Sequence, residues 1–506
     1  MIRTIFLAVV MLLLTIITGA ASPRNKGIGC WRTAKSQQTA MARLASPSQK
    51  PRHTCYHGRK RGLVILAEFT NMQFKNEHTQ QKYNDILNAE GYTTDEGFRG
   101  SVADYFRDQS GGLFEMVFDV AGPYTTKNDY KYYGENDEDG YDLHPEEMIM
   151  EMCRAANADV DFADYDWDGD GEVDEVFVIY AGKGEADSNN KNTIWPHMWS
   201  LTEIGKKLKL DGMVINVYAC SSELKGDGTI DGIGSICHEF SHCLGLPDFY
   251  DTLHGKEFGM SDFDVMDGGC YSGNGFTPVG YTAYEKMVCG WQEPIVLANE
   301  DVTVDSLRPM SEQGDTYILY NDAHPDEYYL IENRQKTGWD ADYPSRGLMI
   351  THVDYDERLW IDNVPNSIYT KEQAKEEGIS GSNDHQRMTI FHADGNDSRW
   401  LINNDLYPYM THDSLTATSK PAATLWNENS EGTKLMQGAI LHIKQRKDGT
   451  VAFQYRAKQP IADAIVAVRA SRSDRKVYTL DGRVAGTAVE SLRHGIYIVD
   501  GKKVVR

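Results

Sequence analysis

The pentapeptide His238-Glu239-Phe240-Ser241-His242 constrains this chain more than any other feature. On an α-helix, two histidines four residues apart project from one face, so both imidazoles can reach a single metal ion. Glu239 lies beside them, where a carboxylate can accept a proton from the attacking water. The surrounding apolar residues give this helix a separate packing face: Ile233, Ile236, Cys237, Phe240, Cys243 and Leu244. The pattern therefore predicts a helix that carries a catalytic zinc site.

The residues after His242 predict how a third ligand returns to the same ion. Gly245 can adopt positive φ and end the helix, and Asp248 follows after Leu246 and Pro247. A catalytic zinc ion needs three protein ligands and a fourth position for water or substrate. We therefore expect Glu239 as the general base and three zinc ligands: His238, His242 and Asp248.

A glycine-containing turn follows, from Phe263 to Gly269. It has the form of the Met-turn that underlies the zinc ion in metzincins. Met266 would then form the hydrophobic floor of the site. Three details stay open: Asp251 or Glu257 could replace Asp248 as ligand, Tyr271 or Tyr281 could support the oxyanion, and His197 could contact substrate or metal.

A second acidic motif runs from Asp166 to Asp174. Acidic side chains stand at positions 1, 3, 5 and 9 and glycine at position 6, as in an EF-hand calcium loop. The twelfth position is Phe177 instead of glutamate, and the residues that follow have the pattern of a strand. We predict a calcium loop grafted before a strand, with a solvated acidic turn as the alternative. Its expected ligands are Asp166, Asp168, Asp170, Glu172 and Asp174.

The N-terminal residues differ in composition from the rest of the chain. Residues 1–21 have a basic start, a short apolar run and small residues before a cleavage point, which predicts a secretory signal and no membrane span. Residues 22–61 contain ten Lys or Arg and no acid, although the whole chain has a net charge of −24. This leader is either a short propeptide ending at Arg59-Lys60-Arg61 or a disordered linker. The acidic body argues against nucleic acid as a partner.

Eight cysteines are compatible with export, but their pairing cannot be read from the sequence. Cys237 and Cys243 flank the zinc motif on the apolar side of its helix, so we interpret them as packing residues. Cys30 or Cys55 of the leader could block the zinc ion as a thiolate ligand.

The distribution of patterns predicts an α/β (α+β) catalytic domain at residues 62–291, with a twisted mixed sheet and the zinc helix. Met213 to Cys220 reads as a strand close to that helix, and we expect an edge strand there to pair with extended substrate. Strand patterns dominate residues 292–457, which we interpret as a β-rich domain. Residues 458–506 carry short strands separated by Asp-Gly turns, which indicates a small β-sandwich module.

These features together resemble the immune inhibitor A family of secreted bacterial zinc metalloproteases. The resemblance covers roughly residues 60–457 and rests on the zinc motif through Asp248 and on the run Asp264-Val265-Met266. It is reinforced by the acidic loop before VFVIYAGKGE, by Ile194-Trp195-Pro196-His197 and by YYLIENRQKTGWD. It implies a metzincin-like fold with zinc and structural calcium, although the leader is shorter than the family's usual propeptide. Residues 458–506 resemble a type IX secretion sorting domain.

The motif and the resemblance predict a secreted zinc metalloendopeptidase that hydrolyses protein or peptide substrates. They also imply a monomer at or beyond the surface of a Gram-negative bacterium, with outer-membrane secretion machinery as a partner. Two other functions stay open. One is a catalytically inactive, calcium-dependent surface or glycan-binding protein on a protease fold. In the other, the acidic β-rich part binds glycan or a host surface and proteolysis is secondary.

Overall fold

The computed structural model describes residues 56–138 and 140–457, together with four short strands between residues 477 and 505. The chain divides into a unit that ends at Arg456 and a second unit that begins at Ala457. The predicted signal sequence, most of the leader, Cys30 and Cys55 lie outside the described residues. Among the described residues, no helix is both long enough and apolar enough to cross a membrane.

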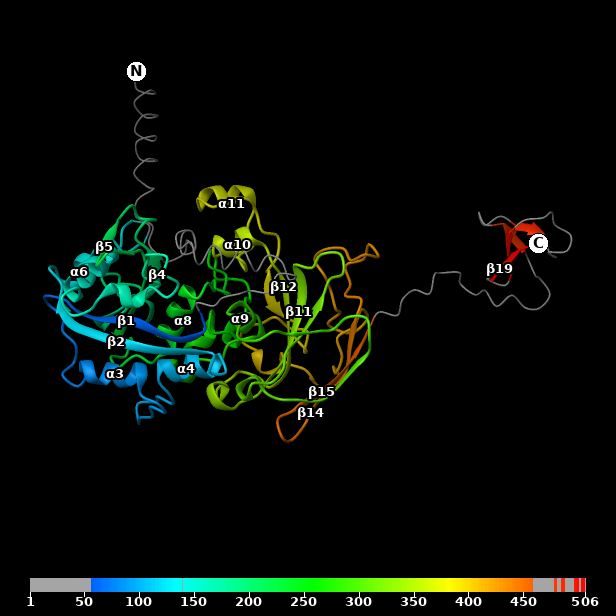
Figure 1. Ribbon diagram of the computed structural model, residues 1–506, viewed down its shortest axis with the longest axis horizontal. Helices are drawn as coiled ribbons and strands as arrows, with labels where there is room; N and C mark the ends of the chain where they lie inside the picture. Colours follow the sequence, from blue (N-terminus) through cyan, green and yellow to red (C-terminus); the bar gives the residue numbers. More distant parts are fainter. Residues whose placement is uncertain are drawn as a thin grey trace, which may run out of the picture. The chain divides into compact units, whose positions relative to one another are not determined.

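The first sheet has five strands in the order β2-β1-β3-β7-β4 (Figure 1). The first four strands in this order are parallel, and β4 is antiparallel to β7. Strands β3 and β7 are almost entirely buried, which explains their long apolar runs, because a parallel sheet is covered on both faces. The strands are β1 (Gly58–Glu68), β2 (Phe114–Thr125), β3 (Val176–Lys183), β4 (His197–Ser200) and β7 (Val217–Leu224).

Helices cover this sheet, with α3 and α4 on one side of β1 and β2 and α6 on the other (Figure 1). Ser101 caps α4 in a reciprocal capping box with Asp104, and Pro145 occupies the first turn of α6, where its missing N–H costs no helical hydrogen bond. The helices of this part are α3 (Gln80–Asn88), α4 (Val102–Gln109), α5 (Tyr130–Gly134), α6 (Pro145–Ala156), α7 (Glu185–Ser188), α8 (Gly234–Cys243) and α9 (Ala283–Val288).

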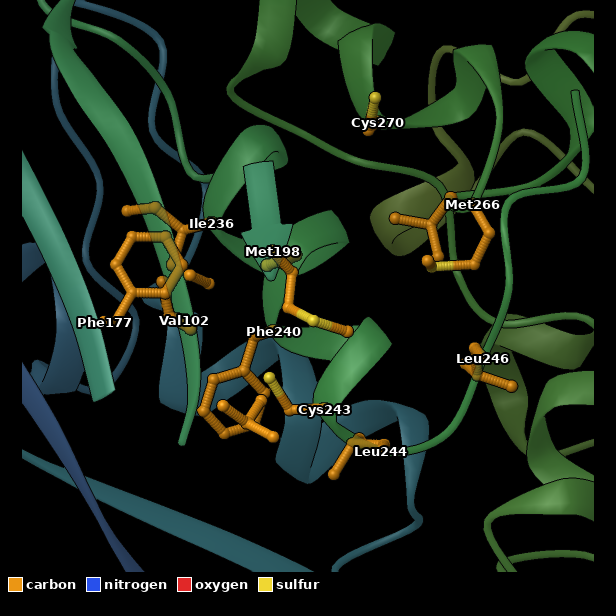
Figure 2. Close-up of a cluster of buried hydrophobic side chains, with 14 of the residues drawn as sticks. Val102, Phe177, Met198, Ile236, Phe240, Cys243, Leu244, Leu246, Met266 and Cys270 are labelled. Carbon is orange, nitrogen blue, oxygen red and sulfur yellow. The ribbon is translucent and has the colours of Figure 1, made fainter. Parts of the chain in front are cut away.

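Helix α8 packs its apolar face into the core between the sheet and α4. In Figure 2, Ile236 and Phe240 lie near Phe177 of β3 and Val102 of α4. The Phe240 ring centroid lies 4.8 Å from that of Phe106. Cys237 and Cys243 on this face are both buried and form no disulfide, which agrees with their prediction as packing residues.

The predicted leader boundary differs from the observed strand. β1 begins at Gly58, so Arg59, Lys60 and Arg61 pair with β2 as part of the folded sheet, although the side chains of Arg59 and Arg61 are exposed. Lys60 Nζ donates to the Trp167 carbonyl at 2.9 Å, and Arg61 forms an ion pair with Asp119 at 2.8 Å. Partners far along the chain therefore hold this basic run in place, and local sequence gives no sign of them.

The expectation of an edge strand at residues 213–220 is wrong. The segment breaks at Asn216 into β6 (Met213–Ile215) and the start of β7. β6 pairs with β5 (Leu208–Leu210) and forms a bridge from Val214 to Glu172, whereas β7 lies inside the sheet between β3 and β4. The edge strand beside α8 is β4, because it pairs with β7 and is the last strand in the order of the sheet.

A second sheet, ordered β13-β12-β11-β10-β8, and a third, ordered β14-β15-β9, follow within the same unit. Two short helices, α10 (Glu357–Ile361) and α11 (Lys371–Glu376), interrupt them. The strands are β8 (Ile295–Val296), β9 (Val302–Leu307), β10 (Tyr317–Tyr320), β11 (Glu327–Arg334), β12 (Gly347–Asp354), β13 (Met388–Ile390), β14 (Ala439–Gln445) and β15 (Val451–Arg456).

The second unit contains a four-stranded antiparallel sheet in the order β17-β16-β18-β19. Its strands are β16 (Val477–Thr479), β17 (Val484–Gly486), β18 (Ile496–Val499) and β19 (Lys502–Val505). These strands fall in the two segments whose sequences have strand patterns separated by Asp-Gly.

Candidate metal and catalytic site

The candidate metal site is built on α8 and on the turn that follows it. Gly234 starts the helix, where an added Cβ would lie 1.9 Å from the Cys270 carbonyl, so only glycine allows this close approach. Gly245 has φ of +92° and follows the last helical turn, as predicted. This left-handed residue sends the chain back toward the helix and leads to Asp248.

Both histidines of the motif are oriented by backbone carbonyls. Nδ1 of His238 lies 2.8 Å from the Val265 carbonyl, and Nδ1 of His242 lies 2.8 Å from the Leu246 carbonyl. A carbonyl can only accept, so each Nδ1 carries the proton and each Nε2 is the unprotonated nitrogen of its ring. The two Nε2 atoms therefore face the same point as potential metal ligands.

Asp248 supplies a third potential ligand at the same point. Its Oδ1 lies 3.2 Å from Nε2 of His238 and 3.3 Å from Nε2 of His242. The same oxygen is buried and has no hydrogen-bond partner, which is costly unless a cation binds it. Two imidazole nitrogens and one carboxylate oxygen are a donor set that fits a tetrahedral zinc ion with one open position.

Asn363, in the loop after α10, fixes the Asp248 carboxylate. Its Nδ2 donates to Asp248 Oδ2 at 2.7 Å, and its Oδ1 accepts from the Asp248 backbone N–H at 2.7 Å. This paired contact turns Oδ1 toward the histidines. Asn363 lies 115 positions after Asp248, and no local motif in the sequence marks it.

The alternative third ligands are engaged elsewhere or lie outside this cluster. The Asp251 carboxylate accepts from the backbone N–H groups of His254 and Lys256, at 3.1 and 2.9 Å. Its role is to stabilise the turn that follows Asp248. Glu257 does not line the cavity that holds the two histidines.

Glu239 is buried, and its carboxylate gathers with the two histidines within 4.8 Å. Burial raises the pKa of Glu239, while the flanking histidines and the Met198 backbone N–H lower it. A carboxylate beside a metal-type donor set is placed to accept and return a proton. Met198 belongs to β4, so the edge strand borders this carboxylate directly.

The predicted Met-turn contacts the candidate site through its backbone. Asp264 Oδ1 accepts a hydrogen bond from the Met266 backbone N–H at 2.8 Å and shapes the turn. The Val265 carbonyl accepts a hydrogen bond from His238 Nδ1. Met266 is fully buried (Figure 2). Sequence alone indicates a turn here, but not that the turn orients His238.

A cavity of about 570 Å³ opens in front of the helix. Tyr271 lines it, whereas Tyr281 is fully buried with its hydroxyl against Ser241, so only Tyr271 of the two candidates reaches the cavity. His197 also lines it and stacks edge-on against Tyr218, with burial lowering its pKa to about 4. Two lining residues that the sequence analysis missed are Tyr250 and Arg399.

The acidic loop before β3 brings three of its five predicted ligands together. Carboxylate oxygens of Asp166, Asp168 and Asp170 lie within 4.8 Å of one another. Burial and the neighbouring carboxylates raise the pKa of Asp168. By contrast, Glu172 accepts from Asn216 and Asp174 accepts from the Trp167 backbone N–H.

The acidic loop also contacts the candidate metal helix. The Trp167 indole lies 6.2 Å from the Phe240 ring and donates its N–H to the Arg61 carbonyl at 2.7 Å. The acidic loop therefore packs against α8 through Trp167.

A mixed sheet, a His-Glu-His helix and a returning aspartate thus form a candidate metal site. Residues 62–291 match the catalytic domain of the immune inhibitor A peptidase M6 family.

Two curated relatives are similar to this chain over part of its length. The chain is 27% identical to immune inhibitor A of Bacillus thuringiensis subsp. alesti over 287 residues, covering 47% of this chain and 41% of that protein. It is 28% identical to the pre-pro-metalloprotease PrtV of Vibrio cholerae over 270 residues, covering 44% of this chain and 29% of that protein. The chain therefore spans less than half the length of either relative.

Proposed function

We propose that this protein is a secreted zinc-dependent endopeptidase that hydrolyses peptide bonds in protein substrates. The observation that carries the proposal is the convergence of the Nε2 atoms of His238 and His242 on the buried Oδ1 of Asp248, which accepts no hydrogen bond. Structural carboxylate–histidine pairs seldom leave such an oxygen without a hydrogen bond in a cavity. The family match of residues 62–291 and the similarity to a Vibrio pre-pro-metalloprotease support the same function.

His238, His242 and Asp248 would hold the zinc ion. When bound, zinc supplies Lewis-acid polarisation of the scissile carbonyl and acidifies the attacking water. Glu239 accepts the proton of that water and delivers it to the leaving amine nitrogen. Burial raises the pKa of Glu239, which favours the protonated form that the second transfer needs. Tyr271 is the tyrosine we propose to face the developing oxyanion.

Strand β4 is the proposed substrate-binding edge. It is the terminal strand of the sheet, and its Met198 backbone reaches Glu239. An extended peptide added along this edge would place its backbone beside the catalytic carboxylate, and main-chain pairing accepts many sequences. This mode suits proteins or peptides as substrates, with side-chain preference set by the cavity walls.

Calcium and export complete the proposal. We propose that Asp166, Asp168 and Asp170 bind a structural Ca²⁺ that stiffens the loop against Trp167 and α8. Residues 1–21 would direct export and the leader would act as a propeptide. Residues 458–506 would address the chain to outer-membrane secretion machinery, with a monomer as the active form.

The test compares caseinolytic activity and zinc content of the wild type and Glu239→Ala, with and without a zinc chelator. We expect the wild type to cleave, the chelator to stop cleavage, and Glu239→Ala to keep zinc but lose activity by about 10²-fold or more. The exposed substitution Glu312→Ala serves as the matched control and should change neither property.

A wild type that binds zinc but cleaves no protein, even after removal of residues 22–55, would refute the peptidase proposal. That result would favour the second candidate, an inactive calcium-dependent binding protein on this fold. The buried Glu239 beside the histidines favours the enzyme, because a binding protein has no chemical use for a desolvated base there.

A further inference from the structure

The loop from Asp394 to Asp405 has an arrangement of oxygen-bearing side chains that neither the motif analysis nor the proposed function uses. It follows β13 and returns on itself, with the Ala393 backbone N–H donating to the Asp405 carbonyl at 2.8 Å. Asp394 Oδ1 accepts from the Asn396 N–H at 2.9 Å, and Asn396 Oδ1 accepts from the Ser398 N–H at 3.1 Å. The side chains of alternate residues thus hold the backbone of the turn two positions further on.

The order of these residues matches the ligand spacing of a twelve-residue calcium loop. With Asp394 as position 1, Asn396 and Ser398 fall at positions 3 and 5, and Asp405 falls at position 12. The Trp400 carbonyl falls at position 7, which supplies a backbone ligand in such loops. Position 6 is Arg399 instead of glycine, and position 12 is aspartate instead of glutamate. At these two positions the loop differs from the calcium-binding pattern.

Asp405 supplies an independent observation. Its side chain has no exposed surface, and neither carboxylate oxygen has a hydrogen-bond partner. His392 Nδ1 lies 3.1 Å from Oδ1, yet this nitrogen also lacks a hydrogen bond. A buried carboxylate without hydrogen bonds is among the most costly groups a fold can contain, unless a cation lies against it.

The charges around Asp405 make the need for a cation greater. Burial raises the pKa of Asp405, His392 opposes this effect, and Asp394 and Asp397 raise the pKa further. The two acidic neighbours are therefore close enough to repel its charge. Among the described residues, no Lys or Arg forms an ion pair with Asp394, Asp397 or Asp405.

We propose that loop 394–405 is a Ca²⁺ site, with the side chains of Asp394, Asn396, Ser398 and Asp405 and the Trp400 carbonyl as ligands. Hard oxygen donors in this number suit Ca²⁺, which takes about six to eight oxygen ligands including water. His392 holds the buried side of Asp405, and its ring packs edge-on against Phe258 at 4.4 Å.

The site borders the candidate catalytic cavity. Arg399, in the middle of the loop, lines that cavity and donates to the Glu257 carbonyl. Ca²⁺ would therefore order the segment that carries Arg399 to the cavity wall. The inference does not depend on peptidase activity, because the loop's donors belong to a different part of the chain from the zinc motif.

The test measures Ca²⁺ stoichiometry by equilibrium dialysis on the full chain, in a Glu239→Ala background that prevents self-cleavage. We expect Asp405→Asn to bind one Ca²⁺ fewer per chain than the background, and Asp168→Asn to lose a different one, so that the losses add in the double variant. Terbium provides the second readout, since Trp400 is placed to sensitise its emission. Trp400→Phe should lose that emission without losing Ca²⁺.

An Asp405→Asn chain that binds as much Ca²⁺ as the background, with equal affinity, overturns the proposal. If Asp405→Asn does not fold, Asn396→Ala in the half-buried turn replaces it, with an expected loss of affinity of about tenfold or more. Unchanged affinity in that variant also overturns the site. If the loop bound zinc instead of Ca²⁺, the proposed identity of the ion would be wrong.

Discussion

At the scale of single residues, the candidate site depends on side chains that leave one atom free and engage the other. Each motif histidine donates Nδ1–H to a carbonyl, which leaves Nε2 for a metal ion. Asp248 does the same with its two oxygens, since Asn363 occupies Oδ2 and Oδ1 has no hydrogen bond. Such outer contacts fix ligand orientation and contribute strongly to metal affinity.

Asn363→Ala should therefore weaken zinc binding although Asn363 is not a proposed ligand. Asp248 would lose the hydrogen bond from Asn363 to its carboxylate and the one that its backbone N–H donates to Asn363. We expect zinc affinity to fall by roughly 10- to 100-fold. Competition with a chromogenic chelator measures this affinity. The exposed Asn76→Ala is the control, and equal affinity in Asn363→Ala and Asn76→Ala would show that the contact does not orient the ligand.

At the scale of elements, α8 has two faces with different tasks. One face presents His238 and His242 to the cavity, and the other packs Phe240 against Phe106 and Phe118. The packing face determines how accurately the helix holds the histidines, because dense cores allow little displacement.

Phe240→Ala should lower the free energy of unfolding by about 3–5 kcal/mol, because it leaves a cavity among buried rings. Chemical denaturation of the metal-free chain measures this change without a contribution from bound zinc. Phe74→Ala, at a partly exposed position, should cost less. Equal losses in the two variants would contradict the assignment of Phe240 to the core.

The second sheet carries a buried carboxylate that links β11 to a distant segment. Glu327 accepts from His352 Nε2 at 2.8 Å and from the Asn427 N–H at 3.0 Å. Burial alone would raise its pKa, but the hydrogen bonds from His352 and the Trp426 backbone lower it to about 2. The ionised group thus attaches residues 426–427 to the start of β11.

The depressed pKa of Glu327 predicts a specific acid dependence. Its stabilising effect is complete above the ordinary glutamate pKa of about 4.3 and is lost as pH falls toward 2. Glu327→Gln should lower stability near neutral pH by about 1–3 kcal/mol and reduce the loss of stability between these pH values. Thermal unfolding across this range measures both effects. The exposed Glu376→Gln should reproduce the wild-type profile.

At the scale of the whole molecule, buried polar contacts join the parts of the larger unit that carry its two five-stranded sheets. Arg334 of β11 is fully buried and donates to the carbonyls of Gly280 and Tyr281, at 2.6 and 3.0 Å. Asn366 donates to the carbonyls of Phe249 and Met388, at 2.7 Å each. The segment around Asn363 therefore depends on the β-rich part, and the candidate site depends on both.

Removal of residues 458–506 should leave the larger unit folded, because its internal contacts end at Arg456. We expect the truncated chain to keep its unfolding temperature within about 2 °C of the full chain and to bind zinc equally. Differential scanning calorimetry and metal analysis measure these properties. Truncation after residue 291 is the contrasting variant and should unfold, since it removes Arg334 and Asn363.

The sequence determined the elements whose signals are local. The spacing of His238 and His242, the positive φ required at Gly245, and the cap at Ser101 each depend on residues within a few positions. The tertiary structure decided the features that depend on distant partners, including Asn363 on Asp248, β4 as the edge strand, and the burial of Asp405. The physical reason is that backbone periodicity and capping act over one or two helical turns, whereas packing and hydrogen bonding join residues regardless of their separation along the chain.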